Sequence, residues 1–177
     1  MTTNGTHHIL TVLVENKFGV LARIAGLFSR RGYNIFSLAV SPTEDDKFSR
    51  MTIVVDGQST PIEQVTKQLN KLIPVVKVTE LTAPAAVERE LMLVTVKATT
   101  EFRSHVTELA AIFEAKILDV GFESMTLMVA GLPDRLDAVT DLLTPFGIVE
   151  LQRTGRIALP KLARTQPRLR AVKNKTA

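Results

Sequence analysis

Residues 9–40 read ILTVLVENKFGVLARIAGLFSRRGYNIFSLAV, and the hydrophobic periodicity of this stretch changes twice. Ile9–Val14 is an almost continuous apolar run, which is typical of a short buried strand. Apolar residues then recur at positions 20, 21, 24, 25, 27 and 28, the spacing of one helix face, until Gly32 provides a stop signal. Tyr33–Val40 returns to strand-like spacing. The stretch therefore predicts a strand, a helix and a second strand.

The chain that follows completes a β-α-β-β-α-β unit. Further strands are expected over Arg50–Val55 and Val75–Leu81. Between them, Thr60-Pro61-Ile62-Glu63 matches a capping box at a helix start, with Pro as the first helical residue. Thr82–Glu88 (TAPAAVE) is predicted to be a linker.

The same order of elements recurs after the linker. Strand, helix, strand, strand, helix and strand are expected over Arg89–Ala98, Glu101–Ala115, Lys116–Gly121, Met125–Gly131, Asp134–Thr144 and Ile148–Thr154. The repeat predicts an α+β fold of two consecutive ferredoxin-like β-α-β-β-α-β units. We divide the chain into domains 1–82 and 83–160 and a tail, 161–177. Because each unit would leave a sheet face or edge open, a homodimer is expected.

The composition excludes several classes of function. Hydrophobic residues make up 45% of the 177 residues, enough for a buried core, and Cys is absent. Disulfides, thiol catalysis and thiolate metal sites are therefore excluded. Only three His residues are present, two of them in the first eight positions, which argues against a histidine-rich metal centre. With no signal-peptide pattern and no apolar run of membrane-spanning length, a cytoplasmic protein is expected.

The basic charge of the chain is concentrated in the tail. Six basic and no acidic residues lie between Lys161 and Ala177, which leaves 16 basic against 18 acidic residues elsewhere. The tail contains Pro167 and shows little hydrophobic periodicity, so it is predicted to be mostly disordered. It is either a solubilising terminus or a segment that contacts an acidic partner or nucleic acid without specificity.

The start of the first predicted helix differs from the other helix starts. Thr60, Thr99 or Thr100, and Pro133-Asp134 provide start signals for the other three helices. The first helix is entered through Gly19, which supplies no oxygen to the free backbone N–H groups. Those amides and the positive end of the helix dipole favour an anion, either a carboxylate or a phosphate.

Two asparagines extend this anion site to an α-amino acid. Asn16 and Asn34 offer amide oxygens that could accept from an ammonium group. An apolar wall is expected from Val12, Val14, Leu21, Ile35 and Leu38. No acid/base pair accompanies these residues, so the site is predicted to bind and not to react. The alternative is turn chemistry, with an Asx-turn at Asn16 and left-handed geometry at Asn34 after Gly32.

Residues 9–40 resemble the N-terminal ACT domain of the small regulatory subunit of acetohydroxyacid synthase, also called acetolactate synthase. SRMTIVV (residues 49–55), KQLNKLIPVVKVTEL (67–81) and VERELMLVTVKA (87–98) resemble the same family. The resemblance covers about residues 8–160 and makes the second unit an ACT-like domain. It assigns effector binding and dimerisation to the first domain.

The resemblance implies a subunit without catalytic activity or cofactors of its own. Its partner would be a catalytic large subunit that uses thiamine diphosphate, Mg²⁺ and FAD to condense two 2-keto acids with loss of CO₂. The small subunit would raise that activity and confer feedback inhibition by L-valine, often also by leucine or isoleucine, in branched-chain amino acid biosynthesis. In this family the effector lies between two ACT domains, which again implies a homodimer.

The resemblance also places the effector contacts. They fall on Asn16, Gly19, Val20, Leu21, Asn34 and Ile35. Two residues depart from the family pattern: Phe18, where Pro, Ser or Ala is usual, and Phe36, where Glu is common. Phe18 is expected to affect the pocket, and Phe36 a surface that meets the partner or the other ACT domain.

The second unit has no matching Asn and Gly pair, so no effector site is assigned to it. Partner contact and dimerisation are its expected roles. At the junction of the two units, Glu88-Arg89-Glu90 is either a salt-bridge network or a solvated charge cluster.

Three other functions compete with this interpretation. The strongest is a free-standing ACT-domain amino-acid sensor that regulates another protein. An RNA-recognition module needs aromatic residues on its central strands, but Arg50–Val55 (RMTIVV) has none, so no specific nucleic-acid partner is expected. An enzyme with ferredoxin-like domains would need a catalytic cluster or a phosphate loop, and neither is found.

Overall fold

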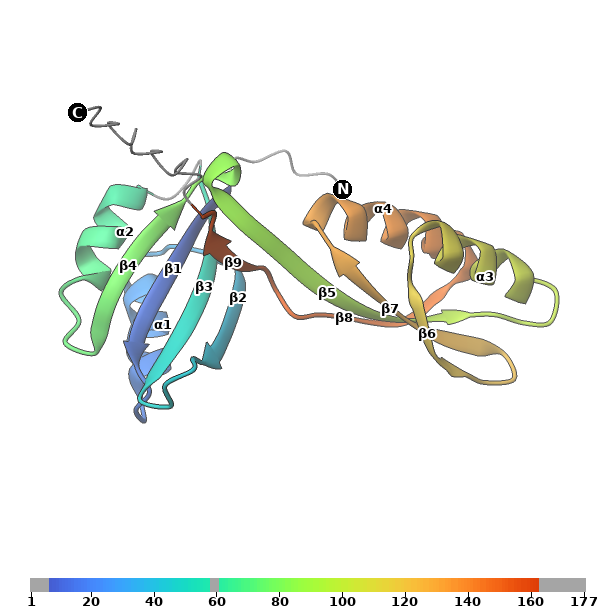
Figure 1. Ribbon diagram of the computed structural model, residues 1–177, viewed down its shortest axis with the longest axis horizontal. Coiled ribbons are helices and arrows are strands. Elements are labelled where there is room, and N and C mark those ends of the chain that lie inside the picture. The colour runs from blue at the N-terminus through green and yellow to red at the C-terminus, as the bar shows by residue number, and fades with distance from the viewer. Residues whose placement is uncertain (1–6, 58–60, 163–177) are drawn as a thin grey trace, which may run out of the picture.

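The computed structural model describes residues 7–57 and 61–162 of the chain. It contains two α+β units, each an antiparallel sheet with two helices on one face (Figure 1). The order of elements is β-α-β-β-α-β in both units, which confirms the predicted fold class. The greater part of the basic tail lies outside the described residues.

The first unit follows the sequence prediction closely. Its elements are β1 (His7–Glu15), α1 (Val20–Arg30), β2 (Ile35–Pro42), β3 (Phe48–Asp56), α2 (Ile62–Leu69) and β4 (Val75–Leu81). The strand order is β2-β3-β1-β4, so β2 and β4 form the edges. Gly32 has a φ of +67° just after α1, where it confirms the predicted stop signal.

The core of the first unit lies between its sheet and its helices. Leu10, Val12 and Val14 alternate along β1 toward the helices and are at most 1% exposed. Ile24 and Phe28 of α1 close the layer from the other side and are equally buried. Burial of each such side chain contributes roughly 1.5–3 kcal/mol, which fixes α1 against β1.

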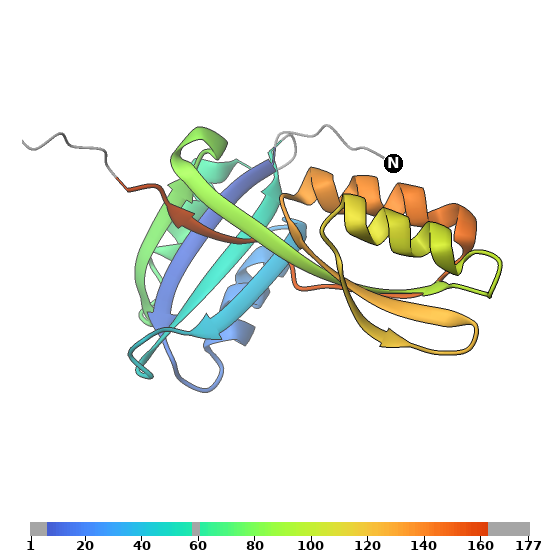
Figure 2. The same cartoon turned by 45° about the vertical axis from the view of Figure 1, so that its right-hand side comes forward.

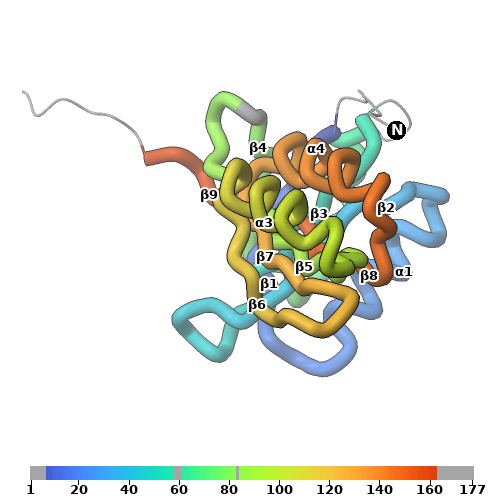
Figure 3. Tube along the Cα trace, turned by 90° about the vertical axis from the view of Figure 1, so that its right-hand side faces the viewer, coloured from blue at the N-terminus to red at the C-terminus, as the bar shows by residue number. Residues whose placement is uncertain are grey.

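The second unit repeats this arrangement. Its elements are β5 (Ala86–Lys97), α3 (Arg103–Ile112), β6 (Lys116–Val120), β7 (Ser124–Gly131), α4 (Pro133–Leu143) and β8 (Ile148–Arg153). The strand order is β6-β7-β5-β8. The helices α3 and α4 lie next to each other on one face of this sheet (Figure 3). A core of twelve buried residues, including Met92, Leu127 and Leu136, fills the layer between this sheet and its two helices.

The predicted linker contains structure that the sequence did not indicate. A 3₁₀ turn at Ala83–Ala85 leads directly into β5, and a further strand, β9 (Ile157–Pro160), pairs with the first four residues of β5. This two-stranded ribbon crosses the face of the first sheet that carries no helix (Figure 2). Ala86 and Ala158 from the ribbon are buried there against Ile9, Val54 and Leu81. The division at residue 82 stays a prediction, and residues from both sides of it share this small core.

The predicted contrast between the first helix start and the other three is wrong at α3. Within the described residues, α1, α2, α3 and α4 all begin without a hydrogen bond from an N-cap side chain. Thr99 or Thr100 is predicted to cap the third helix, but the N-cap of α3 is Phe102. Thr60 lies outside the described residues, and Pro133 is confirmed as a start residue of α4. An uncapped start therefore does not by itself mark α1 as a binding site.

Two further observations concern the described part of the chain. No helix in it is long and apolar enough to cross a membrane. Among the same residues, no group of three or more His, Asp or Glu side chains is arranged to hold a metal ion.

Candidate functional site

The loop between β1 and α1 is fixed by Asn16. Its backbone N–H donates to the carbonyl of Lys47 at 2.7 Å, and its side-chain N–H donates to the carbonyl of Asp46 at 2.9 Å. The side chain therefore ties the loop to the turn before β3 and does not close the Asx-turn considered above. The side-chain oxygen keeps its accepting capacity, since it has no partner among the described residues.

Gly19 provides an open approach to the start of α1. It has a φ of +80°, and a Cβ at this position would meet nothing within 4 Å. The N–H of Val20 donates to the carbonyl of Lys17 at 3.4 Å, whereas helix geometry leaves the amides of Leu21 and Ala22 without a partner in the described structure. Ala22 was not among the predicted contacts, although its place in the first helical turn would have indicated it.

The apolar surroundings differ from those expected. Val12 and Val14 are buried in the core at 0% and 1% exposure, so their predicted part in the ligand wall is wrong. The side chain of Val20 is also buried, and only its backbone could contribute. Leu21 is 41% exposed and remains available, and Phe18 is fully exposed beside Gly19.

Asn34 and Ile35 lie at the start of β2. Asn34 is exposed and has no hydrogen-bond partner among the described residues. Glu114 is the one non-Gly residue of the described chain with positive φ, so left-handed geometry does not explain Asn34. The side chain of Ile35 is half-buried against the first core, as is that of Leu38. Turn chemistry thus fails to account for Asn34.

The six predicted contact residues form two groups in one chain. Asn16, Gly19, Val20 and Leu21 lie at the start of α1, whereas Asn34 and Ile35 follow its end. The helix has 11 residues, so the groups are separated by about 16 Å along its axis. A single α-amino acid is too small to contact both groups in one chain.

Charged residues form a network where the second unit meets the ribbon. Arg153 donates to Glu90 at 2.8 Å and also to Asp137, and Arg156 lies 4.0 Å from Glu88. Burial alone would lower the pKa of Arg153, but its hydrogen bonds to the two carboxylates outweigh burial and raise that pKa. Glu90 is only 7% exposed. The junction is therefore a salt-bridge network and not a solvated charge cluster.

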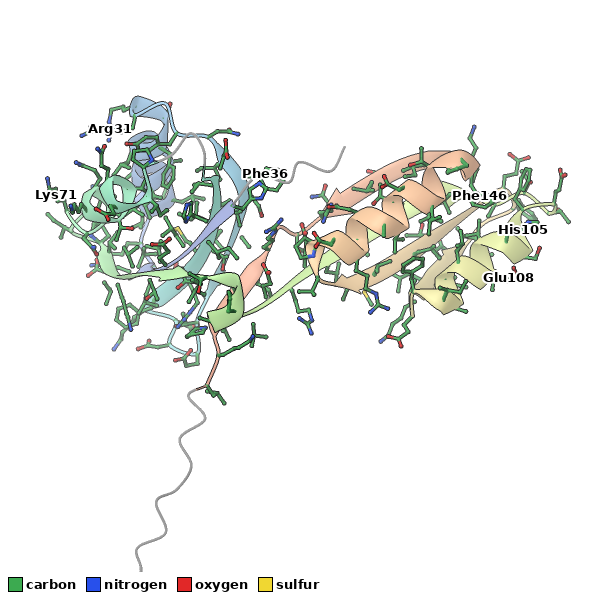
Figure 4. The ribbon with its side chains drawn as sticks, turned by 90° about the horizontal axis from the view of Figure 1, so that it is seen from above. Arg31, Phe36, Lys71, His105, Glu108 and Phe146 are labelled. Carbon is green, nitrogen blue, oxygen red and sulfur yellow. The ribbon has the colours of Figure 1, made fainter. Side chains whose placement is uncertain are left out.

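Phe36 lies on the side of the first unit that faces the second (Figure 4). Its ring centroid is 4.4 Å from that of His7 and 5.9 Å from the Arg156 guanidinium carbon. Burial, followed by the charge of Arg156, lowers the pKa of His7, and Asp56 opposes this shift. The aromatic residue that departs from the family pattern therefore belongs to the contact between the two units.

These features define a class of protein. Two ACT-like ferredoxin folds follow one another in the chain, and the open helix start at Gly19 offers backbone donors. This arrangement is suited to holding a small polar ligand.

Comparison with known proteins identifies the family. Residues 10–77 match the family model described as an AHAS small subunit-like ACT domain, and residues 89–162 match the one described as the small subunit of acetolactate synthase. A probable acetolactate synthase small subunit from Archaeoglobus fulgidus is 54% identical over 152 residues, covering 86% of this chain and 95% of that one. The acetolactate synthase small subunit of Mycolicibacterium smegmatis is 48% identical over 160 residues, covering 90% and 94%.

A solved structure supports the same conclusion. The small subunit of acetolactate synthase from Thermotoga maritima superposes with a TM-score of 0.82 at 37% identity, covering 88% of this chain and 98% of that one. The chain belongs to the family of acetolactate synthase small subunits. It thus belongs with the regulatory, non-catalytic subunits of that enzyme, as the resemblance implied.

Proposed function

We propose that this chain regulates a catalytic large subunit of acetohydroxyacid synthase in the cytoplasm. It raises the activity of that subunit and confers feedback inhibition by L-valine, with leucine or isoleucine as competing effectors. Thiamine diphosphate, Mg²⁺ and FAD belong to the catalytic subunit, and this chain carries no cofactor. Membership of the small-subunit family supports the proposal.

The main support for the effector proposal is the distance between the two groups of predicted contacts, one at the start of α1 and one at the start of β2. β1 and β2 are both antiparallel to β3, so they run in the same direction, and α1 starts at the edge of the sheet where β2 ends. If two copies pair side by side through their β2 edge strands about a two-fold axis, the start of one β2 meets the end of the other. Asn34 of the partner subunit then approaches Gly19, and the dimer contains two equivalent sites.

The residues around such a site fit an α-amino acid. The carboxylate would accept from the amides of Leu21 and Ala22 at the positive end of α1, which contributes roughly 0.3–1 kcal/mol when exposed and about 2 kcal/mol when partly buried. The side-chain oxygens of Asn16 and of the partner's Asn34 would accept from the ammonium group. Leu21 provides apolar surface for a branched side chain.

Regulation requires that L-valine bind one state of the complex better than another. A coupling free energy of about 1–3 kcal/mol between the two sites would change activity roughly 5- to 150-fold. The second candidate function is a free-standing ACT-domain sensor that regulates another protein through the same site. Copurification and activation of a thiamine-diphosphate-dependent large subunit separate the two functions.

The test compares Gly19→Asp with Gly19→Asn in the complex with the catalytic subunit. Both variants carry a side chain of the same shape at a position with a φ of +80°, where Asn is tolerated, and both meet open space. Only Asp places a negative charge where the ligand carboxylate should lie. Gly19→Asp is expected to raise the L-valine concentration for half-inhibition at least tenfold above that of Gly19→Asn, with activation retained in both.

Two controls complete the test. Thermal unfolding of the isolated protein with L-valine and with D-valine shows whether binding is stereospecific; saturation at about 100 times Kd should stabilise each site by roughly 2.7 kcal/mol. Equal inhibition of the Asp and Asn variants would show that the effector carboxylate does not bind at Gly19.

A further inference from the structure

The connection between β8 and β9 lies directly against β2. The backbone N–H of Arg156 donates to Ser37 Oγ at 3.0 Å, across 119 residues of sequence. A Cβ at Gly155 would lie 2.7 Å from Ser37 Oγ and 3.2 Å from the carbonyl oxygen of Leu38. Gly155 also has a φ of +79°, so glycine is required here both for space and for conformation. The backbone of this segment is in close contact with β2.

The same segment is bound on its other side to the second unit. Thr154 donates its N–H to the carbonyl of Leu91 at 3.0 Å, and the N–H of Leu91 donates to Thr154 Oγ1 at 3.1 Å. Arg153, one residue earlier, holds Glu90 of β5 and Asp137 of α4. The four consecutive residues 153–156 therefore connect β2 with the second unit: residues 155 and 156 contact β2, and residues 153 and 154 contact β5.

The space beside this segment is a small polar cleft. It has a volume of about 330 Å³ and is lined by residues of both units, including Phe36, Ser37, Asp137 and Arg153. Arg156 lies over Phe36 with its guanidinium carbon 5.9 Å from the ring centroid. The cleft lies between the two units, and residues 153–156 all line it.

We propose that residues 153–156 transmit the effector-induced change of β2 to the second unit. Ser37 and Gly155 act as positioning residues in this coupling. The inference rests on the proposed function, because it takes Asn34 and Ile35 as effector contacts, and Ser37 follows Ile35 by two residues on the same strand. A displacement of β2 moves the backbone of residues 155 and 156, and through Arg153 and Thr154 it moves β5 and α4.

The ribbon of β5 and β9 is a second connection between the units, which makes the proposal testable. Its buried residues Ala86 and Ala158 pack on the first sheet and do not depend on Ser37. Removing the Ser37 hydroxyl should therefore weaken the coupling while both units stay folded and joined.

The first experiment compares Ser37→Ala with Ser104→Ala in the complex with the catalytic subunit. Ser104 lies on α3, away from β2, and its exposed side chain has no hydrogen-bond partner among the described residues, so it serves as the control. Ser37→Ala is expected to bind L-valine with Kd within about twofold of the wild type and to keep activation. Its half-inhibition concentration should rise roughly fivefold or more, or its maximal inhibition should fall, while Ser104→Ala inhibits normally. Unchanged inhibition in Ser37→Ala, or an equal loss in Ser104→Ala, would overturn the proposal.

A second measurement needs no effector and so separates the two proposals. Hydrogen exchange at the amide of Arg156 should become roughly two- to tenfold faster in Ser37→Ala, as expected for the loss of one hydrogen bond. Exchange in residues 35–42 should rise with it, and Ser104→Ala should leave the Arg156 amide unchanged. Unchanged exchange at Arg156 in Ser37→Ala would refute the connection itself. Absence of L-valine binding to the wild type would instead refute the proposed function.

Discussion

Arg153 offers the sharpest test of what holds the second unit together. Its guanidinium donates to Glu90 on β5 at 2.8 Å and to Asp137 on α4. The two carboxylates differ in environment, because the Glu90 side chain is 7% exposed and that of Asp137 is 46% exposed. Replacing Arg153 by Met keeps most of the aliphatic length and removes the charge, so Glu90 is left buried without its partner.

The expected loss follows from that burial. Breaking one side of a buried ion pair costs about 3–5 kcal/mol. Arg153 is itself 28% exposed, so water reaches the pair and we expect the lower end, about 3 kcal/mol. For a chain of this length, that lowers Tm by roughly 6–12 °C. The exposed pair with Asp137 contributes less than about 1 kcal/mol, so Asp137→Asn should have a small effect.

The free energy of unfolding in urea should be measured for four proteins: wild type, Arg153→Met, Asp137→Asn, and Arg153→Met combined with Glu90→Gln. Glu90→Gln removes the buried unpaired charge and should recover part of the loss caused by Arg153→Met. A loss below about 1 kcal/mol for Arg153→Met, or no recovery in the double variant, would show that Glu90 is solvated and that our account of this network is wrong.

Two further predictions concern the first unit. The folded state lowers the pKa of His7. The free energy of unfolding should therefore be highest above the ordinary His pKa of about 6.5 and should fall as the pH drops from there through the lowered pKa of His7. His7→Gln should flatten this dependence in urea unfolding measured between pH 8 and pH 5. Asn16→Ala removes the 2.9 Å hydrogen bond to Asp46 and should lower the unfolding free energy by about 0.5–1.5 kcal/mol, and should also weaken L-valine binding. A stability loss with unchanged L-valine affinity would assign Asn16 a structural role alone.

The sequence predicted most of the fold because the pattern is local. The helical spacing between positions 20 and 28 and the apolar runs on both sides place β1, α1 and β2 within a few residues of their observed bounds. The repeat of the same order then predicts the second unit. Where periodicity and stop signals agree, as at Gly32, nothing from the rest of the chain is needed.

The elements that the sequence missed depend on contacts between distant residues. β9 has only four residues, and its strand conformation rests on pairing with Ala86–Arg89, about seventy residues earlier. The first three residues of β5, Ala86–Glu88, were predicted to belong to the linker (TAPAAVE), whereas the rest of β5 was predicted as a strand from Arg89. Glu90 pairs with Arg153 at the end of β8, and Glu88 lies 4.0 Å from Arg156 in the segment that follows. At these positions of β5 a paired charge takes the place of an apolar residue.

The two groups of effector contacts were named from the sequence and its family resemblance, and their role stays a prediction. The open start at Gly19 is observed, although the argument from helix caps fails because α3 is equally uncapped. The tie between Asn16 and Asp46 could not be predicted, since it joins residues thirty positions apart. Burial of Val12 and Val14 follows from β1 being a central strand of the sheet, a property of the whole unit and not of the stretch itself.

The central claim is that each effector site is shared between two copies of the chain. Gly19→Asp and Asn34→Ala each damage a different half, so a mixed dimer of the two variants contains one site with both changes and one with neither. Differently tagged variants can be coexpressed and the mixed dimer purified through both tags. Calorimetric titration with L-valine should then find one site per mixed dimer at wild-type affinity and none in either parent homodimer. If the mixed dimer binds no L-valine while the wild type binds two, the site lies within one chain and the account is contradicted.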